Sequence, residues 1–125
     1  MATSRLLRWA DIAPEQMNSL TTRQYVVGTN TMLARLVLKK DAHVPLHHHV
    51  NEQMSHVVQG SLNFMLEGKT VTVRAGEILC IPPDVPHEVV ALEDSVALDI
   101  FNPTRQYWID GDDAYLRSDK PGSKG

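Results

Sequence analysis

The sequence has one cysteine, few aromatic residues and no long apolar run, and each scarcity excludes a class of protein. Cys80 cannot form an internal disulfide, and no Cys-x-x-Cys pair is present for zinc or redox chemistry. No segment approaches the roughly 18 apolar residues of a membrane-spanning helix. The N-terminus lacks the apolar segment of a secretory signal. With 42% hydrophobic and 22% charged residues, we expect a soluble, cytoplasmic protein.

Positive charge is also scarce, whereas histidine is concentrated in one region. The net charge is −3, which excludes the basic surface that nucleic-acid binding requires. The 125 residues suit one domain with a core of its own. Five of the six histidines lie between residues 43 and 56, so this region is the first place to look for function.

Short apolar and β-branched runs separated by turn residues begin at Gln24. In one of them Leu62, Phe64 and Leu66 alternate with more polar side chains, and Glu67–Lys69 is a hairpin turn. Many short strands at regular spacing predict an all-β sandwich or barrel. The chain then divides into an N-terminal segment, 1–22, with a short helix within residues 8–20, a barrel, 23–109, and a polar tail, 110–125, in which Tyr115 and Leu116 dock on the body.

Three consecutive histidines suggest a metal site. On a strand His47 and His49 share one face, and His48 points to the other. Two imidazoles on one face can hold a transition metal, and His87 is the candidate for a third. The alternative is a solvated surface turn.

A fourth ligand is expected from the segment that follows His49. Gln53 has the same strand parity as His49, whereas Glu52 points to the opposite face. We therefore favour Gln53 over Glu52. Three histidines and an amide leave a divalent metal with its full charge, which favours Lewis-acid work or orientation of an anionic substrate over oxygen chemistry.

A second candidate group lies on the last apolar run. Asp99 interrupts this run and shares a strand face with Phe101. Desolvation of such a carboxyl raises its pKa and suits it to acid–base work, and Arg105 is placed to bind a substrate carboxylate with two hydrogen bonds. The alternatives are an Asp99 exposed on an edge strand or a structural Asp99–Arg105 pair.

The remaining distinctive side chains are expected to be structural. We expect Cys80 to be a buried thiol and the methionines to lie in the core. The residues with such structural interpretations are Met32, Met54, Met65 and Cys80 in the core, Trp9 and Trp108 in packing or dimer contacts, and His43 and His56 as surface or hydrogen-bonded histidines.

The spacing of these residues resembles the two motifs of the cupin superfamily. The first motif, G-x5-H-x-H-x3,4-E-x6-G, is matched by Asp41, His47, His49, Gln53 and Gly60. The second, G-x5-P-x-G-x2-H-x3-N, is matched by Gly76, Pro82, Asp84, His87 and Ala91. Asp41 and Asp84 stand where glycine is usual, and aspartate can replace glycine in turns. The resemblance implies a single-domain, RmlC-like jelly-roll barrel.

The ending LDIFNPTR narrows the resemblance to the small KdgF-type cupins of pectin and alginate breakdown. In that family three histidines and one glutamine hold the metal, which implies His47, His49, His87 and Gln53 here. Its catalytic Asp-x-Phe-x3-Arg pattern is matched by Asp99, Phe101 and Arg105.

The family resemblance implies an activity. KdgF-type proteins open the ring of 4,5-unsaturated monouronates to linear keto sugars. We accordingly expect an enzyme that binds an anionic sugar or organic acid and one divalent metal per chain, with nickel, zinc, iron, manganese and copper all open. The alternatives are a cupin dioxygenase or lyase acting on another small organic acid, and a non-catalytic small-molecule-binding cupin. We also expect a homodimer, in which residues 23–39 cover a neighbour's sheet edge.

Overall fold

The computed structural model describes residues 3–117, and most of this range is strand. The elements in chain order are a 3-10 helix (Trp9–Asp11), β1 (Glu15–Asn18), β2 (Thr21–Val27), β3 (Met32–Leu38), β4 (His43–His47), β5 (Glu52–Gln59), β6 (Ser61–Leu66), β7 (Lys69–Arg74), β8 (Ile78–Ile81), β9 (His87–Ala91), β10 (Ser95–Asn102), α1 (Gln106–Ile109) and a second 3-10 helix (Ala114–Leu116). Within residues 3–117, no helix is long and apolar enough to cross a membrane.

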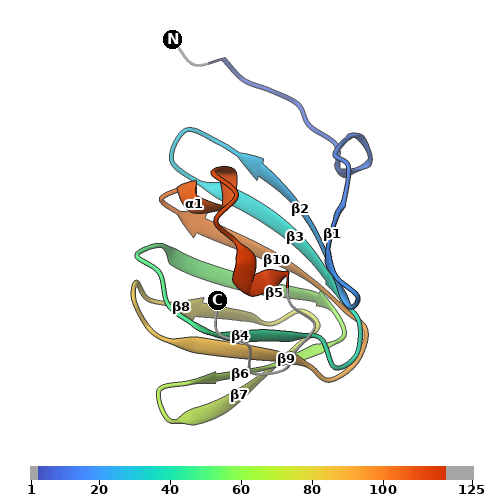
Figure 1. Cartoon of the computed structure of the whole chain (residues 1–125), viewed down its shortest axis with the longest axis vertical. Coiled ribbons are helices and arrows are strands. Elements are labelled where there is room, and N and C mark those ends of the chain that lie inside the picture. Colours follow the sequence, from blue (N-terminus) through green and yellow to red (C-terminus); the bar gives the residue numbers. More distant parts are fainter. Residues whose placement is uncertain (1–2, 118–125) are drawn as a thin grey trace.

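The strands form two antiparallel sheets that face each other across one core (Figure 1). The larger sheet has the order β1-β2-β3-β10-β5-β8 and the smaller one the order β4-β9-β6-β7. Strands that are distant in sequence lie side by side, such as β10 between β3 and β5. This arrangement of crossovers between two sheets is a jelly roll, and it confirms the predicted all-β, cupin-type fold.

Alternating side chains of both sheets build the core. In β3 Met32 and Leu38 are buried and the residues between them alternate between buried and half-buried. In β6 Leu62, Phe64 and Leu66 are all buried, as their alternation predicted. Because successive strand side chains point to opposite faces, each strand gives one row to the core and one to the outside.

The N-terminal segment forms strand where a helix was expected. Within residues 8–20, the structure has only a short 3-10 helix, followed by β1. Helix-start residues such as Pro14 are outweighed here by sheet pairing, because β1 pairs with β2 and buries Met17 in the core. Local propensity is a weak preference that tertiary contacts override.

The end of the described chain packs on the barrel. Asp113 and Leu116 are buried, and Tyr115 packs against the core, so the expected docking of Tyr115 and Leu116 is confirmed. Residues 118–125 of the predicted polar tail lie outside the described residues.

Three predicted core residues lie outside the core. Met65 is half-buried on β6, on the face opposite Phe64, and the other two lie on the outer face of the larger sheet. Cys80 is exposed and pairs across β5–β8 with Met54, which is 40% exposed. The core-facing neighbour of Cys80 is Ile81, and the buried neighbour of Met54 is Gln53. The prediction was wrong because the apolar run around Cys80 carries no alternation from which its inward face could be read.

The turns of the two cupin motifs adopt the left-handed backbone that glycine favours. Gly60 and Gly76 have φ angles of 82° and 89°, and Asp41 and Asp84 have φ angles of 75° and 63°. Aspartate is one of the few side-chain-bearing residues that visit this region routinely, so both departures from the glycine pattern keep the expected turn geometry.

Gly60 is constrained by space as well as by backbone angle, which gives a testable prediction. A Cβ atom at Gly60 would lie 2.4 Å from the carbonyl oxygen of Asp94, whereas one at Gly76 would meet nothing within 4 Å. We expect Gly60→Ala to lower the free energy of unfolding by about 3 kcal/mol or more. Gly76→Ala, with strain alone, should cost about 1–2 kcal/mol. Urea denaturation measures both, and equal losses would contradict the clash at Gly60.

Candidate metal centre

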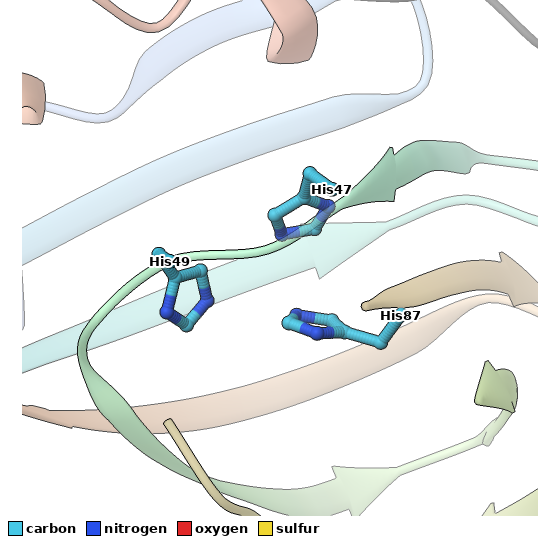
Figure 2. A group of neighbouring side chains, drawn as sticks. All are labelled: His47, His49 and His87. Atoms are coloured by element: carbon cyan, nitrogen blue, oxygen red, sulfur yellow. The ribbon is translucent and has the colours of Figure 1, made fainter. Parts of the chain in front are cut away.

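Three histidines converge at one end of the barrel. His47 ends β4, His87 begins β9, and the two residues are partners across this antiparallel pair. His49 lies in the connection from β4 to β5. One ring nitrogen of each lies within 4.8 Å of the others, and Figure 2 shows the three rings turned toward a common point. This arrangement can hold a metal ion.

Hydrogen bonds fix the ring orientation of all three histidines. Each Nδ1 lies within 3.0 Å of a backbone carbonyl oxygen, that of Pro45 for His47, Asn51 for His49 and Val85 for His87. An Nδ1–H that donates to a carbonyl leaves Nε2 with a lone pair. The buried Nε2 of His87 has no hydrogen-bond partner in the described chain. The donor set therefore fits a metal ion bound through Nε2 atoms.

The electrostatic surroundings keep these imidazoles neutral. Burial, the neighbouring His87 and Arg105 lower the pKa of His47 to about 3. Burial, Arg105 and His87 lower the pKa of His49 to about 4, and burial also lowers the pKa of His87. Metal ligation requires a neutral imidazole, so the site is in its ligating form at neutral pH.

Gln53 is placed to supply a fourth ligand. Its Oε1 lies 3.0 Å from His49 Nε2, and its Nε2 donates to Ser55 Oγ at 2.9 Å. With His49 neutral and Nδ1 as its donor, Nε2 and Oε1 are two acceptors that face each other. A cation bound by both atoms would resolve this conflict.

The other histidines do not join this group. His48 is 66% exposed and lies 3.9 Å from Asp84, so it points away from the triad as predicted. His43 pairs with Glu88. Glu52 is exposed, whereas Gln53 is buried, so the geometry favours the amide over the neighbouring carboxylate.

Asp99 lies inside the barrel. It belongs to β10, an inner strand of the larger sheet, and its side chain is 6% exposed. Burial raises the pKa of Asp99 to about 6, against the opposing effects of a Ser55 hydrogen bond and of Arg105. Its Oδ1 has no hydrogen-bond partner among the described residues. A solvent-exposed Asp99 on an edge strand is therefore excluded.

Arg105 is a buried cation in an aromatic cage. It is 3% exposed, and its guanidinium carbon lies 4.2 to 5.9 Å from four ring centroids, those of Phe101, Tyr107, Trp108 and Tyr115. It donates hydrogen bonds to two phenol oxygens. In the described chain it forms no ion pair with a carboxylate, so the structural Asp99–Arg105 pair is absent. Buried charges are normally paired, and this one is free to bind an anion.

Phe101 packs between the histidine triad and the aromatic residues around Arg105. Its ring contacts His49 and Trp108 edge-on, with centroid distances of 5.9 and 5.4 Å. It is fully buried, so its place in the predicted site is that of a wall behind the histidines. Trp108 is likewise a packing residue, as expected.

Two cavities meet at this group. A small interior cavity of about 40 Å³ is lined by His47, Gln53, His87, Asp99, Arg105 and Tyr115, together with apolar core residues. A solvent-open cavity of about 590 Å³ also reaches His47, Arg105 and Tyr115 and adds His48, His49 and Tyr107. All of the predicted site residues except Phe101 therefore line one or both of two cavities that share His47, Arg105 and Tyr115.

Several site residues were absent from the sequence-based prediction. Tyr107 and Tyr115 bind Arg105, and Ser55 links Gln53 to Asp99. The available sequence signal is the cluster of aromatic residues, Tyr107, Trp108 and Tyr115, beyond the last apolar run.

The comparisons with known proteins agree with this architecture. Residues 34–101 match the family described as Cupin domain, more than half of the chain, and the chain belongs to the cupin family. It is similar to the structure of KdgF from Halomonas sp., with a TM-score of 0.80 and 25% identity over 85% of this chain and 99% of that one. No protein of curated function matches the chain.

Two further solved structures support the fold alone. An RmlC-like cupin from Shewanella frigidimarina has a TM-score of 0.78 and 23% identity, covering 85% of this chain and 96% of that one. A predicted oxalate decarboxylase from Thermotoga maritima has a TM-score of 0.70 and 18% identity, covering 80% of this chain and all of that one (100%).

The triad makes a clear prediction for metal binding. His47→Ala, His49→Ala and His87→Ala should each lose most bound metal, whereas the matched variant His48→Ala should retain one divalent ion per chain. Metal analysis of the purified proteins measures this, with circular dichroism to verify the fold. Loss of metal in His48→Ala with retention in His49→Ala would contradict the observed orientation.

Proposed function

We propose that this chain is a metal-dependent cupin enzyme that opens the ring of 4,5-unsaturated monouronates. The observation that carries the proposal is the buried guanidinium of Arg105, which has no described carboxylate partner and stands beside three convergent histidines and a buried acid. An anionic substrate would supply the missing charge. The Asp-x-Phe-x3-Arg resemblance and the similarity to KdgF give the substrate class.

The proposed ligands are His47, His49, Gln53 and His87, which suit nickel, zinc, iron, manganese or copper. When bound, a divalent metal polarises the sugar oxygens that it contacts. Arg105 binds and orients the carboxylate, and the aromatic cage around it excludes water, which strengthens that ion pair. The homodimer and the cytoplasmic location stay predictions.

Asp99 is proposed to move the proton. Ring opening removes the proton of the anomeric hydroxyl, breaks the bond between the anomeric carbon and the ring oxygen, and delivers a proton to the double bond, so that the product is an isomer of the substrate. A carboxyl whose pKa is raised to about 6 is populated in both protonation states near neutral pH, and it can accept one proton and donate another.

Replacement of Asp99 tests this role. Asp99→Asn keeps the shape and removes the titrating group, so turnover should fall roughly 10²- to 10⁴-fold with metal still bound. The assay follows the disappearance of the 4,5-unsaturated uronate, with metal content as the control. Full activity in the variant would remove Asp99 from the mechanism.

Replacement of Arg105 tests substrate binding. Arg105→Lys keeps a positive charge but loses the planar fork that pairs with a carboxylate. The Michaelis constant should rise about tenfold or more while kcat changes less. A variant with an unchanged Michaelis constant and native thermal stability would show that the carboxylate binds elsewhere.

A second candidate function follows from the small interior cavity. About 40 Å³ holds a few water molecules, so a compact organic acid would suit the interior better than a sugar. Decarboxylase or lyase chemistry on such an acid, or an iron-dependent oxygenation, is the alternative. This alternative would be favoured by two results together. The wild-type protein would not consume unsaturated uronates with any candidate metal, and it would consume oxygen or a small organic acid.

A further inference from the structure

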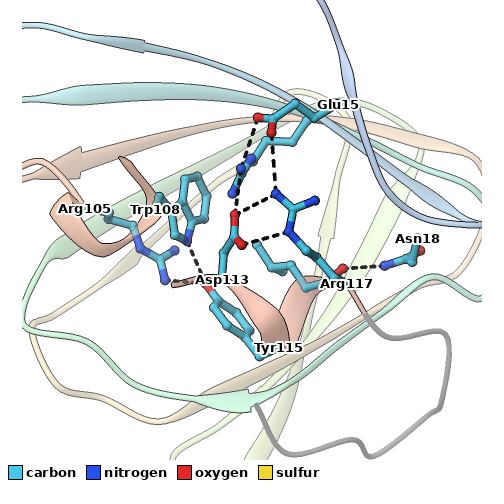
Figure 3. A network of polar contacts seen from close by, with 9 residues as sticks. Glu15, Asn18, Arg105, Trp108, Asp113, Tyr115 and Arg117 are labelled. Carbon is cyan, nitrogen blue, oxygen red and sulfur yellow. Dashed lines mark hydrogen bonds and ion pairs between the residues drawn. The ribbon is translucent and has the colours of Figure 1, made fainter. Parts of the chain in front are cut away.

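The segment that follows the last strand is fastened to the barrel by buried ion pairs. Asp113 lies 2.8 Å from Arg23 Nη2. Arg117 also binds Asp113 (Figure 3). Arg23 is 1% exposed. Burial alone would raise the pKa of Asp113, but hydrogen bonds from Arg117 and Arg23 hold it below its usual value. Asn18 adds a hydrogen bond to the carbonyl of Leu116 at 2.8 Å. Together these contacts fix the backbone around Tyr115.

Tyr115 lies against the histidine triad. Its ring centroid is 4.9 Å from that of His47. It lines both the interior cavity and the open cavity. A ligand beside His47 in either cavity therefore lies near the phenol ring.

The Tyr115 hydroxyl has a proton with no described acceptor. Its oxygen accepts one hydrogen bond from Arg105 Nη2 and another, at 3.0 Å, from Trp108 Nε1. A phenol oxygen with both acceptor positions used has only its own O–H left to donate. Within residues 3–117, no acceptor for this proton is recorded.

The surroundings keep this hydroxyl protonated, and its contact with Arg105 polarises it. Burial raises the pKa of Tyr115 above its usual value, although the charge of Arg105 and the hydrogen bonds from Trp108 and Arg105 act to lower it. The phenol therefore keeps its proton at neutral pH. A hydrogen bond accepted from a guanidinium polarises the O–H, which strengthens donation in a chain of hydrogen bonds.

We infer that Tyr115 is a ligand-binding residue whose hydroxyl donates a hydrogen bond to an oxygen of the anion held by Arg105. Arg105 and Tyr115 then form one oxyanion subsite beside the metal centre, and the subsite favours a sugar acid over the neutral sugar. The identity of that anion as a monouronate rests on the proposed function.

Binding of a saturated monouronate tests this inference without requiring any reaction. The probe is galacturonate, titrated calorimetrically into the nickel-loaded protein, with galactose as the neutral counterpart. Tyr115→Phe keeps the ring against His47 and removes only the hydroxyl. It should weaken galacturonate binding roughly 10- to 100-fold, the usual effect of one hydrogen bond to a charged group, and leave nickel binding unchanged.

A matched control is available in Tyr25. Tyr25 packs against the indole of Trp108, the residue that also donates to Tyr115, with ring centroids 6.0 Å apart. It has no recorded hydrogen bond to Arg105. Tyr25→Phe should leave galacturonate affinity within about twofold of wild type. Unchanged affinity in Tyr115→Phe, or no galacturonate binding by the wild type, would overturn the inference.

A fluorinated tyrosine separates direct donation from support of Arg105. Fluorination beside the hydroxyl, introduced at position 115 alone, makes the phenol a better donor and a poorer acceptor. If Tyr115 donates to the ligand, galacturonate binds more tightly; if Tyr115 only positions Arg105 by accepting its hydrogen bond, galacturonate binds more weakly. Tighter binding supports the inference, and weaker or unchanged binding overturns it.

The test also distinguishes this inference from the proposed function. Tyr115-dependent galacturonate binding in a protein that does not consume unsaturated uronates would support the subsite and refute the activity. Turnover of unsaturated uronates with the same Michaelis constant in wild type and Tyr115→Phe would support the activity and refute the subsite.

Discussion

The antiparallel pairing of β4 with β9 is the constraint on which the candidate site depends. It sets His47 opposite His87, so two candidate metal ligands far apart in sequence become neighbours through strand pairing. A shift of one residue in either strand would turn its histidine to the other face of the sheet. The remaining groups, Gln53 and Asp99, come from the opposite sheet, and the buried core between the sheets holds them at the required distance.

Two buried guanidinium groups explain how the charges of the site are arranged. Arg23 and Arg105 lie 4.6 and 4.2 Å from the same indole ring of Trp108. Arg23 is neutralised by Asp113 and Glu15, whereas Arg105 has only phenol oxygens and aromatic faces as described partners. Arg23 fastens the segment after β10 to the barrel. Arg105 adds uncompensated positive charge beside the three convergent histidines, which favours an anionic ligand.

The part of the site that could be predicted from sequence is the part with a local pattern. The faces of His47, His48 and His49 were correct, although these residues do not form one continuous strand, because the connection from β4 to β5 preserves their orientation. A buried Asp99 was one of the alternatives that the sequence left open, and the structure selects it because Asp99 shares its strand face with the buried Phe101. Cys80 and Met54 were misplaced because their apolar surroundings have no period. The docking of Tyr115 was predicted, but its contact with Arg105 and the Arg23–Asp113 pair join segments distant in sequence, and no local pattern specifies such pairs.

The wall opposite the histidines is carried by a segment that belongs to neither sheet. Arg105, Tyr107 and Tyr115 follow β10, and their positions depend on side-chain contacts instead of strand register. Substitutions, insertions or exchange of this segment would therefore alter ligand preference while the candidate metal ligands, held by strands and by the β4–β5 connection, stay in place. The strands and the connection between β4 and β5 thus fix the candidate metal ligands, while the segment after β10 supplies the groups that would select a ligand.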